Sequence, residues 1–280
     1  MTSITARSLS KSFGPIDAVV DLSFDVGPGE VVGLLGANGA GKTTTMRILL
    51  GLLAPTSGEV LIGGQVTQRI DRHVIGYVPQ GLGLYRDLTV AENLSFAAAA
   101  FGVPTPSLTE EDLEEFADRR VGEISLGLRR RLAFVVARCH QPSVLILDEP
   151  TSGVGPLGRA RLWETVHETA QDGAAVLVST HHMEEAEECD RVILMSAGRE
   201  IASGSVADVI GGAYSVSVSG DVSDAALRIL SETGGTVLVS GEGWRVVGLD
   251  SATVTRIVGP DGSVERVPAS FEEAFVALSR

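Results

Sequence analysis

The sequence lacks any apolar run long enough to cross a lipid bilayer. A spanning helix needs about 18 or more predominantly apolar residues, and the longest candidate, residues 94–103, is shorter and is interrupted by Ser95 and Gly102. Residues 1–8 contain no apolar block of the kind found in a secretory signal peptide. We therefore expect the chain to stay in the cytosol unless a partner holds it at a membrane.

Cysteine and basic residues are also scarce. The two cysteines, Cys139 and Cys189, fall in apolar segments that look helical, so we expect buried thiols and no disulfide framework. Acidic residues outnumber basic ones by 36 to 22, for a formal net charge of −14. Proteins that bind nucleic acid generally display a basic face. The composition thus argues against a nucleic-acid partner, and the five histidines show no paired metal-ligand spacing.

The most informative stretch is a glycine-rich segment, residues 36–43. It fits G-x-x-x-x-G-K-[ST] at every fixed position, between an apolar run typical of a buried strand (residues 31–35) and an expected helix (residues 42–50). In such a loop the backbone N–H groups bind phosphate, Lys42 neutralises the β- and γ-phosphates, and the Thr43 hydroxyl binds Mg²⁺. The candidate nucleotide-binding residues here are Gly36, Ala37, Asn38, Gly39, Ala40, Gly41, Lys42, Thr43 and Thr44.

Two further apolar runs end in polar side chains. Residues 144–147 lead directly into Asp148 and Glu149, and ligands of doubly wound sheets lie beyond the carboxyl ends of the strands. We expect Asp148 to hold Mg²⁺, directly or through water, and Glu149 to position and polarise an attacking water. Residues 175–179 lead to His181, for which the residues alone leave a functional and a structural role open.

A helical block interrupts this α/β pattern. Thr89 and Glu92 form a capping box for a helix that continues to Phe101. A second, acidic helix is expected over residues 107–120 and a third over residues 125–141, which together predict an inserted helical subdomain at about 89–141. From residue 212 onward, short strands and helices predict a small α+β domain.

Taken in order, these features resemble the ATPase subunit of ABC transporters over residues 1–211. The resemblance makes Glu149 the catalytic glutamate and His181 the switch histidine, with Lys42 on the phosphates. It places Gln80 in the Q-loop, where it joins Thr43 and Asp148 as a Mg²⁺ contact. It also makes Phe13 the aromatic that stacks on adenine, whereas the residues alone favour a core position for that side chain.

The resemblance implies a P-loop NTPase α/β core over residues 1–211 and a small C-terminal α+β domain over residues 212–280. It implies Mg²⁺-dependent ATP hydrolysis that powers a separate integral-membrane permease, from the cytoplasmic face of the cell membrane. Residues 180–187 and 268–279 resemble the drug- and antibiotic-exporter branch. An alternative is a soluble regulatory or translation-associated ABC protein, but those usually carry two cassettes or a long coiled coil. A binding-only protein is not expected, since Lys42 and Glu149 are both present.

Three departures from the family pattern stand out. The signature segment, residues 124–128, keeps Ser125 and Gly127 as candidate contacts to the nucleotide of a second subunit, but has Leu126 in place of a glycine and Leu128 in place of a polar residue. Gly155 stands where the family has an aspartate, and the helical insert looks short. Two arrangements remain open: a homodimer that tolerates these changes, or a heterodimer with an ATPase chain whose signature is intact.

Overall fold

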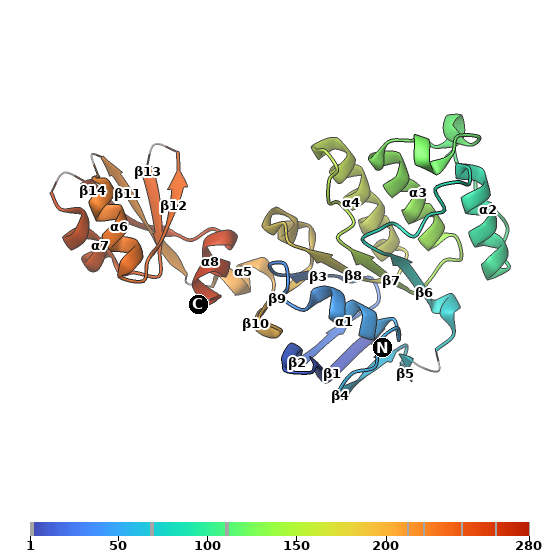
Figure 1. Cartoon of the computed structure of the whole chain (residues 1–280), viewed down its shortest axis with the longest axis horizontal. Coiled ribbons are helices and arrows are strands. Elements are labelled where there is room, and N and C mark those ends of the chain that lie inside the picture. The colour runs from blue at the N-terminus through green and yellow to red at the C-terminus, as the bar shows by residue number, and fades with distance from the viewer. Residues whose placement is uncertain are drawn as a thin grey trace. The chain divides into compact units, whose positions relative to one another are not determined.

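The chain folds into two compact units, Met1–Glu200 and Ile201–Arg280. A computed structural model describes residues 3–67, 70–109, 112–211, 213–220, 222–241, 243–260 and 262–279 (Figure 1). The division between the units lies before residue 212, where the sequence pattern placed the change. Each unit is described in turn.

A six-stranded sheet forms the centre of the first unit. Its order is β10-β9-β3-β8-β7-β6, and the pairs β3–β8, β3–β9, β6–β7 and β7–β8 are parallel. The strands are β3 (Val31–Leu35), β6 (Ile75–Val78), β7 (Val144–Asp148), β8 (Ala175–Thr180), β9 (Arg191–Ser196) and β10 (Arg199–Gly204). The expected strands at residues 31–35, 144–147 and 175–179 are thus confirmed.

Both faces of this sheet are covered, which explains the continuous apolar runs of its strands. On one face, α1 (Lys42–Leu49) packs between the six-stranded sheet and a smaller antiparallel sheet of order β2-β1-β4-β5. The smaller sheet consists of β1 (Ile4–Phe13), β2 (Ile16–Val26), β4 (Ser57–Ile62) and β5 (Gln65–Val66). On the other face, α3 (Leu126–Arg138) and α4 (Pro156–Gln171) cover the sheet through Phe134 and Trp163.

Helices α2 (Val90–Phe101) and α3 form the inserted helical part. The capping box is confirmed, because the Thr89 hydroxyl accepts from the Glu92 N–H and the Glu92 carboxylate accepts from the Thr89 N–H. The expected acidic helix at residues 107–120 is wrong for the part that the structure describes, which contains the short 3₁₀ turn η3 (Glu114–Phe116) and is followed by a second one, η4 (Val121–Glu123). Asp112 has a left-handed φ of 52°, which breaks an α-helix, and Glu110 lies outside the described residues.

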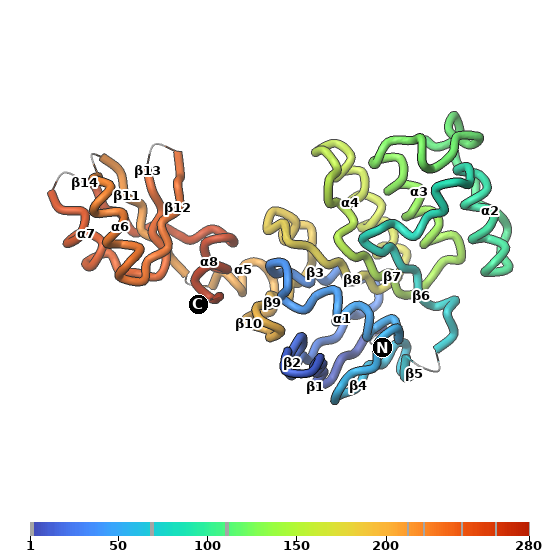
Figure 2. The backbone as a smooth tube through the Cα atoms, viewed as in Figure 1, coloured from blue at the N-terminus to red at the C-terminus, as the bar shows by residue number. Residues whose placement is uncertain are grey.

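The second unit is a four-stranded antiparallel sheet of order β12-β13-β11-β14. In chain order its elements are α5 (Val206–Ile210), β11 (Tyr214–Gly220), α6 (Asp224–Glu232), β12 (Thr236–Ser240), β13 (Gly243–Val247), α7 (Ser251–Val258), β14 (Gly262–Pro268) and α8 (Phe271–Leu278), a path that can be followed in Figure 2. The run from β11 to β14 is the β-α-β-β-α-β arrangement of ferredoxin-like folds. Helices α6 and α7 pack on Val216, Val218 and Val246 of the sheet.

Two expectations about the whole chain can also be compared with the structure. Among the helices that the structure describes, none is long and apolar enough to span a bilayer.

Cys139 and Cys189 are free thiols, as expected, but each is only partly buried. Cys139 caps the end of α3 and Cys189 caps the end of η5 (Met183–Glu188), and each packs against the margin of a buried apolar cluster.

Candidate functional site

The loop between β3 and α1 is built around glycine. Gly41 caps α1 with a φ of 104°, and a Cβ at this position would lie 2.4 Å from the carbonyl oxygen of Ala18. Both the backbone conformation and the space therefore require glycine. The glycine-rich loop brings its N–H groups to the N-terminus of α1, where a helix binds anions most readily.

Lys42 is buried directly beneath this loop. Its Nζ donates to the carbonyl oxygens of Gly36, at 2.6 Å, and Ala37, at 3.2 Å. Desolvation by burial lowers the pKa of the Lys42 ammonium, and the charges of Glu149 and Asp148 oppose that shift. The ammonium thus lies among backbone oxygens and acids that a phosphate group can replace as its partners.

A cavity of about 350 Å³ lies over the loop. Its size is within the range of small-molecule sites. It brings the predicted loop together with two predicted residues from distant parts of the chain, Gln80 and Glu149. The lining residues are Ala18, Asn38, Gly39, Ala40, Gly41, Lys42, Thr43, Thr44, Gln80 and Glu149.

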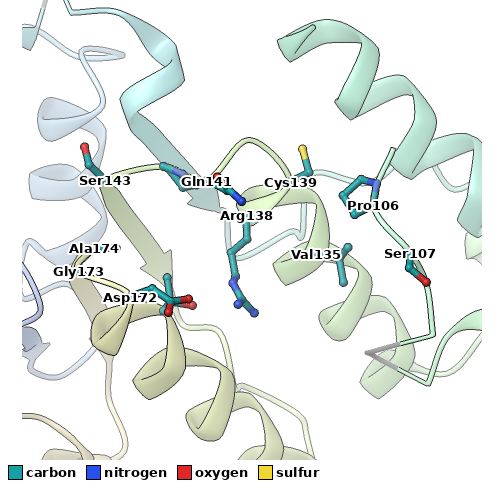
Figure 3. Close-up of a pocket in the computed structure, with 12 residues that line it drawn as sticks. Pro106, Ser107, Val135, Arg138, Cys139, Gln141, Ser143, Asp172, Gly173 and Ala174 are labelled. Carbon is teal, nitrogen blue, oxygen red and sulfur yellow. The ribbon is translucent and has the colours of Figure 1, made fainter. Parts of the chain in front are cut away.

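A larger cavity, of about 750 Å³, lies elsewhere in the first unit and contains none of the predicted site residues. Figure 3 shows its lining at the C-terminal end of α3, near Arg138, and at the end of α4, near Asp172. Of these two cavities, the smaller one is the candidate nucleotide site, because it combines a phosphate-binding loop with a lysine and a carboxylate.

The ends of β7 and β8 hold the acidic pair in place. Asp148 lies opposite Ser179 in the parallel ladder, and the Ser179 hydroxyl donates to Asp148 Oδ1 at 2.6 Å. The Glu149 N–H donates to the same hydroxyl oxygen at 3.0 Å. The Glu149 carbonyl accepts from Nη1 of the buried Arg130, also at 3.0 Å. These contacts fix Glu149 in a left-handed conformation, with a φ of 49°, which is uncommon outside functional sites for a residue other than glycine.

The Glu149 carboxylate lies between the other two predicted site residues. Its Oε2 accepts a hydrogen bond from Gln80 Nε2 at 3.0 Å. Its Oε1 lies 3.2 Å from His181 Nδ1, a close contact without hydrogen-bond geometry. The structure thus brings Gln80, Glu149 and His181 together from the ends of three different strands.

The candidate metal contacts are all oxygen donors. Thr43 offers a hydroxyl, Gln80 an amide oxygen and Asp148 a carboxylate whose Oδ1 is already bonded to Ser179. Mg²⁺ prefers oxygen ligands and is usually held by one or two carboxylates together with substrate phosphates. Within the described ranges, no group of three or more histidine, cysteine or acidic side chains could hold a metal by itself. The residues fit a Mg²⁺ ion that arrives with a nucleotide.

The signature residues lie outside this cavity. Ser125 caps α3, its hydroxyl accepting from the Leu128 N–H at 3.4 Å, and Gly127 is in the first turn of that helix. Leu126 is 39% exposed, and its Cδ2 lies 3.0 Å from the position that a Cβ on Gly153 would occupy. Ser125 and Gly127 do not line the cavity over their own loop.

Phe13 lies at the end of β1 and is 48% exposed. The ammonium of Lys11 lies 5.1 Å from the centre of its ring. Phe13 belongs to none of the buried apolar clusters of the first unit. The interpretation from the residues alone, which favoured the core, is therefore wrong, and an exposed ring is open to stacking.

Sequence reasoning missed two residues that support the acidic pair. Ser179 could have been found, since it is a polar residue at the carboxyl end of an apolar strand. Arg130 lies in a run of three arginines, residues 129–131, which by itself gives no sign of this role. It is buried, and its Nη2 also donates to the Ser152 carbonyl at 2.5 Å.

Comparison with known proteins agrees with this geometry. Residues 19–152 match the family model described as ABC transporter. The probable multidrug ABC transporter ATP-binding protein YbhF of Escherichia coli (strain K12) is 40% identical over 219 residues, a match that covers 74% of this chain and 38% of the relative. The Nod factor export ATP-binding protein I of Burkholderia lata is 43% identical over 213 residues, covering 72% of this chain and 70% of the relative. The chain thus spans well under half of the E. coli relative.

Solved structures give the same result. The structure of an ATP-binding subunit of an ABC transporter superposes with a TM-score of 0.66 at 31% identity, covering 74% of this chain and 92% of the other. The dimeric structure of MJ0796, a bacterial ABC transporter cassette, has a TM-score of 0.65 at 25% identity and covers 72% and 98%. This chain belongs to the ABC transporter family, as an ATP-binding subunit with the fold of an ABC ATPase.

Proposed function

We propose that this chain hydrolyses ATP with Mg²⁺ and thereby powers a separate membrane permease, in a transporter that exports a drug or another amphipathic compound. The observation that carries the proposal is the position of the Glu149 carboxylate, held between Gln80 and His181 beside the Lys42 loop. A carboxylate at this position can orient a water molecule toward a phosphate on the loop.

Each predicted residue has a distinct role in this proposal. The loop N–H groups and Lys42 bind the β- and γ-phosphates and offset the negative charge that builds up during phosphoryl transfer. Glu149 orients the attacking water and accepts its proton as the bond from the γ-phosphorus to ADP breaks, and His181 contacts the γ-phosphate. Thr43, Gln80 and Asp148 would hold Mg²⁺, which supplies further neutralisation of the phosphate charge when bound.

The proposed partners rest on two kinds of observation. One is the position of the signature residues outside the cavity, and the other is the names of the relatives. Because Ser125 and Gly127 do not line the cavity of their own subunit, we propose that they serve the nucleotide of a second ATPase subunit. The dimeric cassette among the similar structures supports this arrangement. The export role rests on the relatives, one named as a multidrug transporter protein and one as a Nod factor export protein. The proposed location is the cytoplasmic face of the cell membrane, on the permease.

The experiment is to purify the chain from native membranes and measure ATP hydrolysis in the resulting complex. We expect a multi-spanning membrane protein to co-purify, and hydrolysis that requires Mg²⁺ and is lost in Lys42→Ala. Arg7→Ala is the matched control, because Arg7 is an exposed cation that pairs with the exposed Glu59. Full hydrolysis by Lys42→Ala would contradict the assignment of phosphate binding to this loop. Purification without a membrane protein would contradict the proposal of a permease partner.

A further inference from the structure

The two edges of the sheet in the second unit differ sharply. Strands β12 and β14 are the edges. β14 carries the exposed charges Glu265 and Arg266 and ends at Pro268, features that hinder pairing with another strand. β12 has the sequence Thr-Val-Leu-Val-Ser, without charge or proline, and its Val239 is 84% exposed. One edge is therefore protected against strand addition and the other is not.

The register of β12 shows which backbone groups face outward. Ser240 lies opposite Gly243 at the hairpin end, Val239 opposite Trp244 and Leu238 opposite Arg245. Hydrogen-bonded and non-hydrogen-bonded pairs alternate along an antiparallel ladder, and the pair that closes a two-residue hairpin is hydrogen-bonded. The backbone of Leu238 therefore bonds to Arg245. The N–H and C=O groups of Val237 and Val239 point away from β13, toward the open edge.

The sequence of β12 is close to a palindrome centred on Leu238. In an antiparallel pair of two copies of β12, Leu238 lies opposite Leu238, and Val237 opposite Val239 of the second copy. Thr236 then lies opposite Ser240, so all five residues of the strand are paired. In this register Val237 and Val239 of the two copies exchange N–H···O=C bonds, and these are the two residues whose backbone groups face outward. Sequence symmetry and backbone register agree.

We propose that β12 is a self-association edge, which pairs antiparallel with β12 of a second copy of this chain and joins their two sheets into one. A twofold interface places Leu238 against its symmetry mate and the other residues against residues of the same strand, so like charges on the strand would repel each other. The absence of charge from β12 is notable in a chain with a net charge of −14. Helix α6, which packs against β12, carries an exposed apolar side chain, Ile229, 47% exposed.

The register is tested by cross-linking the full-length chain without nucleotide. Leu238→Cys places two thiols directly opposite each other in a non-hydrogen-bonded pair, where side chains lie closest. We expect mild oxidation to give a disulfide-linked dimer, and much less dimer from Val237→Cys, since Val237 lies opposite Val239. Ser263→Cys, on the exposed part of β14, is the matched control. The unchanged chain shows how much dimer forms through its own thiols, Cys139 and Cys189. Cross-linking of Leu238→Cys no greater than that of Ser263→Cys would overturn the proposal.

Association itself is tested by sedimentation equilibrium of the nucleotide-free chain. Val239→Lys brings a charge into the paired edge, and we expect the dimer dissociation constant to rise about tenfold or more. Ser263→Lys, the same charge on the other edge, is expected to leave it unchanged. Because Val239 is almost fully exposed, the folded unit should retain its thermal stability. Equal association of Val239→Lys and the unchanged chain, or no association of the unchanged chain at micromolar concentration, would overturn the proposal.

Discussion

The side-chain amide of Gln80 donates a hydrogen bond to the carboxylate of Glu149, over 3.0 Å. The two residues are 69 positions apart in the chain, and the parallel pairing of β6 and β7 brings them together at one edge of the sheet. The donor nitrogen of Gln80 faces Glu149, which leaves its amide oxygen for the Mg²⁺ contact that we propose. A displacement of the segment after β6 would therefore change both that proposed contact and the orientation of the glutamate.

We expect Phe13→Ala to weaken nucleotide binding without unfolding the protein. An aromatic ring stacked on a base contributes enough that its loss should raise the KM for ATP about fivefold or more. A core phenylalanine changed to alanine would cost about 3–5 kcal/mol of stability, but Phe13 is half exposed. Phe96→Ala is the control, since Phe96 is 54% exposed on α2. Steady-state kinetics and thermal unfolding separate the two roles: a large loss of melting temperature with unchanged KM would contradict stacking.

Leu126 tests whether the two ATPase subunits are identical. Leu126 is the first residue of α3, and its side chain is partly exposed. The resemblance to ABC ATPases places a glycine here, which lets backbone N–H groups approach a phosphate. In a homodimer both sites contain this leucine, so we expect Leu126→Gly to raise ATP hydrolysis of the assembled transporter severalfold. Unchanged hydrolysis would instead indicate a heterodimer, in which an intact signature from another chain serves the active site.

His73 predicts a pH dependence of stability. Its Nδ1 lies 2.8 Å from the Asp71 carboxylate and its Nε2 lies 3.1 Å from the carbonyl oxygen of Phe101, the last residue of α2. Both partners are acceptors, so both hydrogen bonds require the doubly protonated ring. The hydrogen bond to Asp71 is the main cause that raises the pKa of His73, followed by the bond to Phe101.

The sign follows from that raised pKa. The contribution of His73 to the free energy of unfolding is fully present below the ordinary histidine pKa of about 6.5. It is lost as the pH rises through the higher pKa of the folded state. Thermal unfolding should therefore show a larger difference in melting temperature between the unchanged chain and His73→Ala at a mildly acidic pH, where Asp71 is still ionised, than at an alkaline pH. Because both side chains of the pair are exposed to solvent, we expect this difference to be small. Asp71→Asn should reduce the pH dependence, and an equal difference at both pH values would contradict the ion pair.

The sequence motifs located the phosphate loop, the acidic pair and His181, because each depends on local chemistry at a strand end. The mixture of short strands and helices in the second unit is also a local signal, and the capping box of Ser270 and Glu273 at the start of α8 is of this kind. The part of residues 107–120 that the structure describes is not the expected acidic helix, because nothing in an acidic sequence indicates the left-handed backbone of Asp112. Arg130 could not be assigned, since its partners are backbone oxygens of Glu149 and Ser152, which no side-chain motif records.

ATP hydrolysis by Glu149→Gln tests the central claim most directly. The amide keeps the shape of the side chain and can still accept the Gln80 hydrogen bond, but it cannot accept a proton from water. Glu184→Gln is the control, because Glu184 is an exposed acid paired with Arg159. With saturating ATP and Mg²⁺, we predict that Glu149→Gln binds ATP normally and loses about a hundredfold or more in kcat, whereas Glu184→Gln keeps its activity. Near-normal turnover by Glu149→Gln would contradict the account.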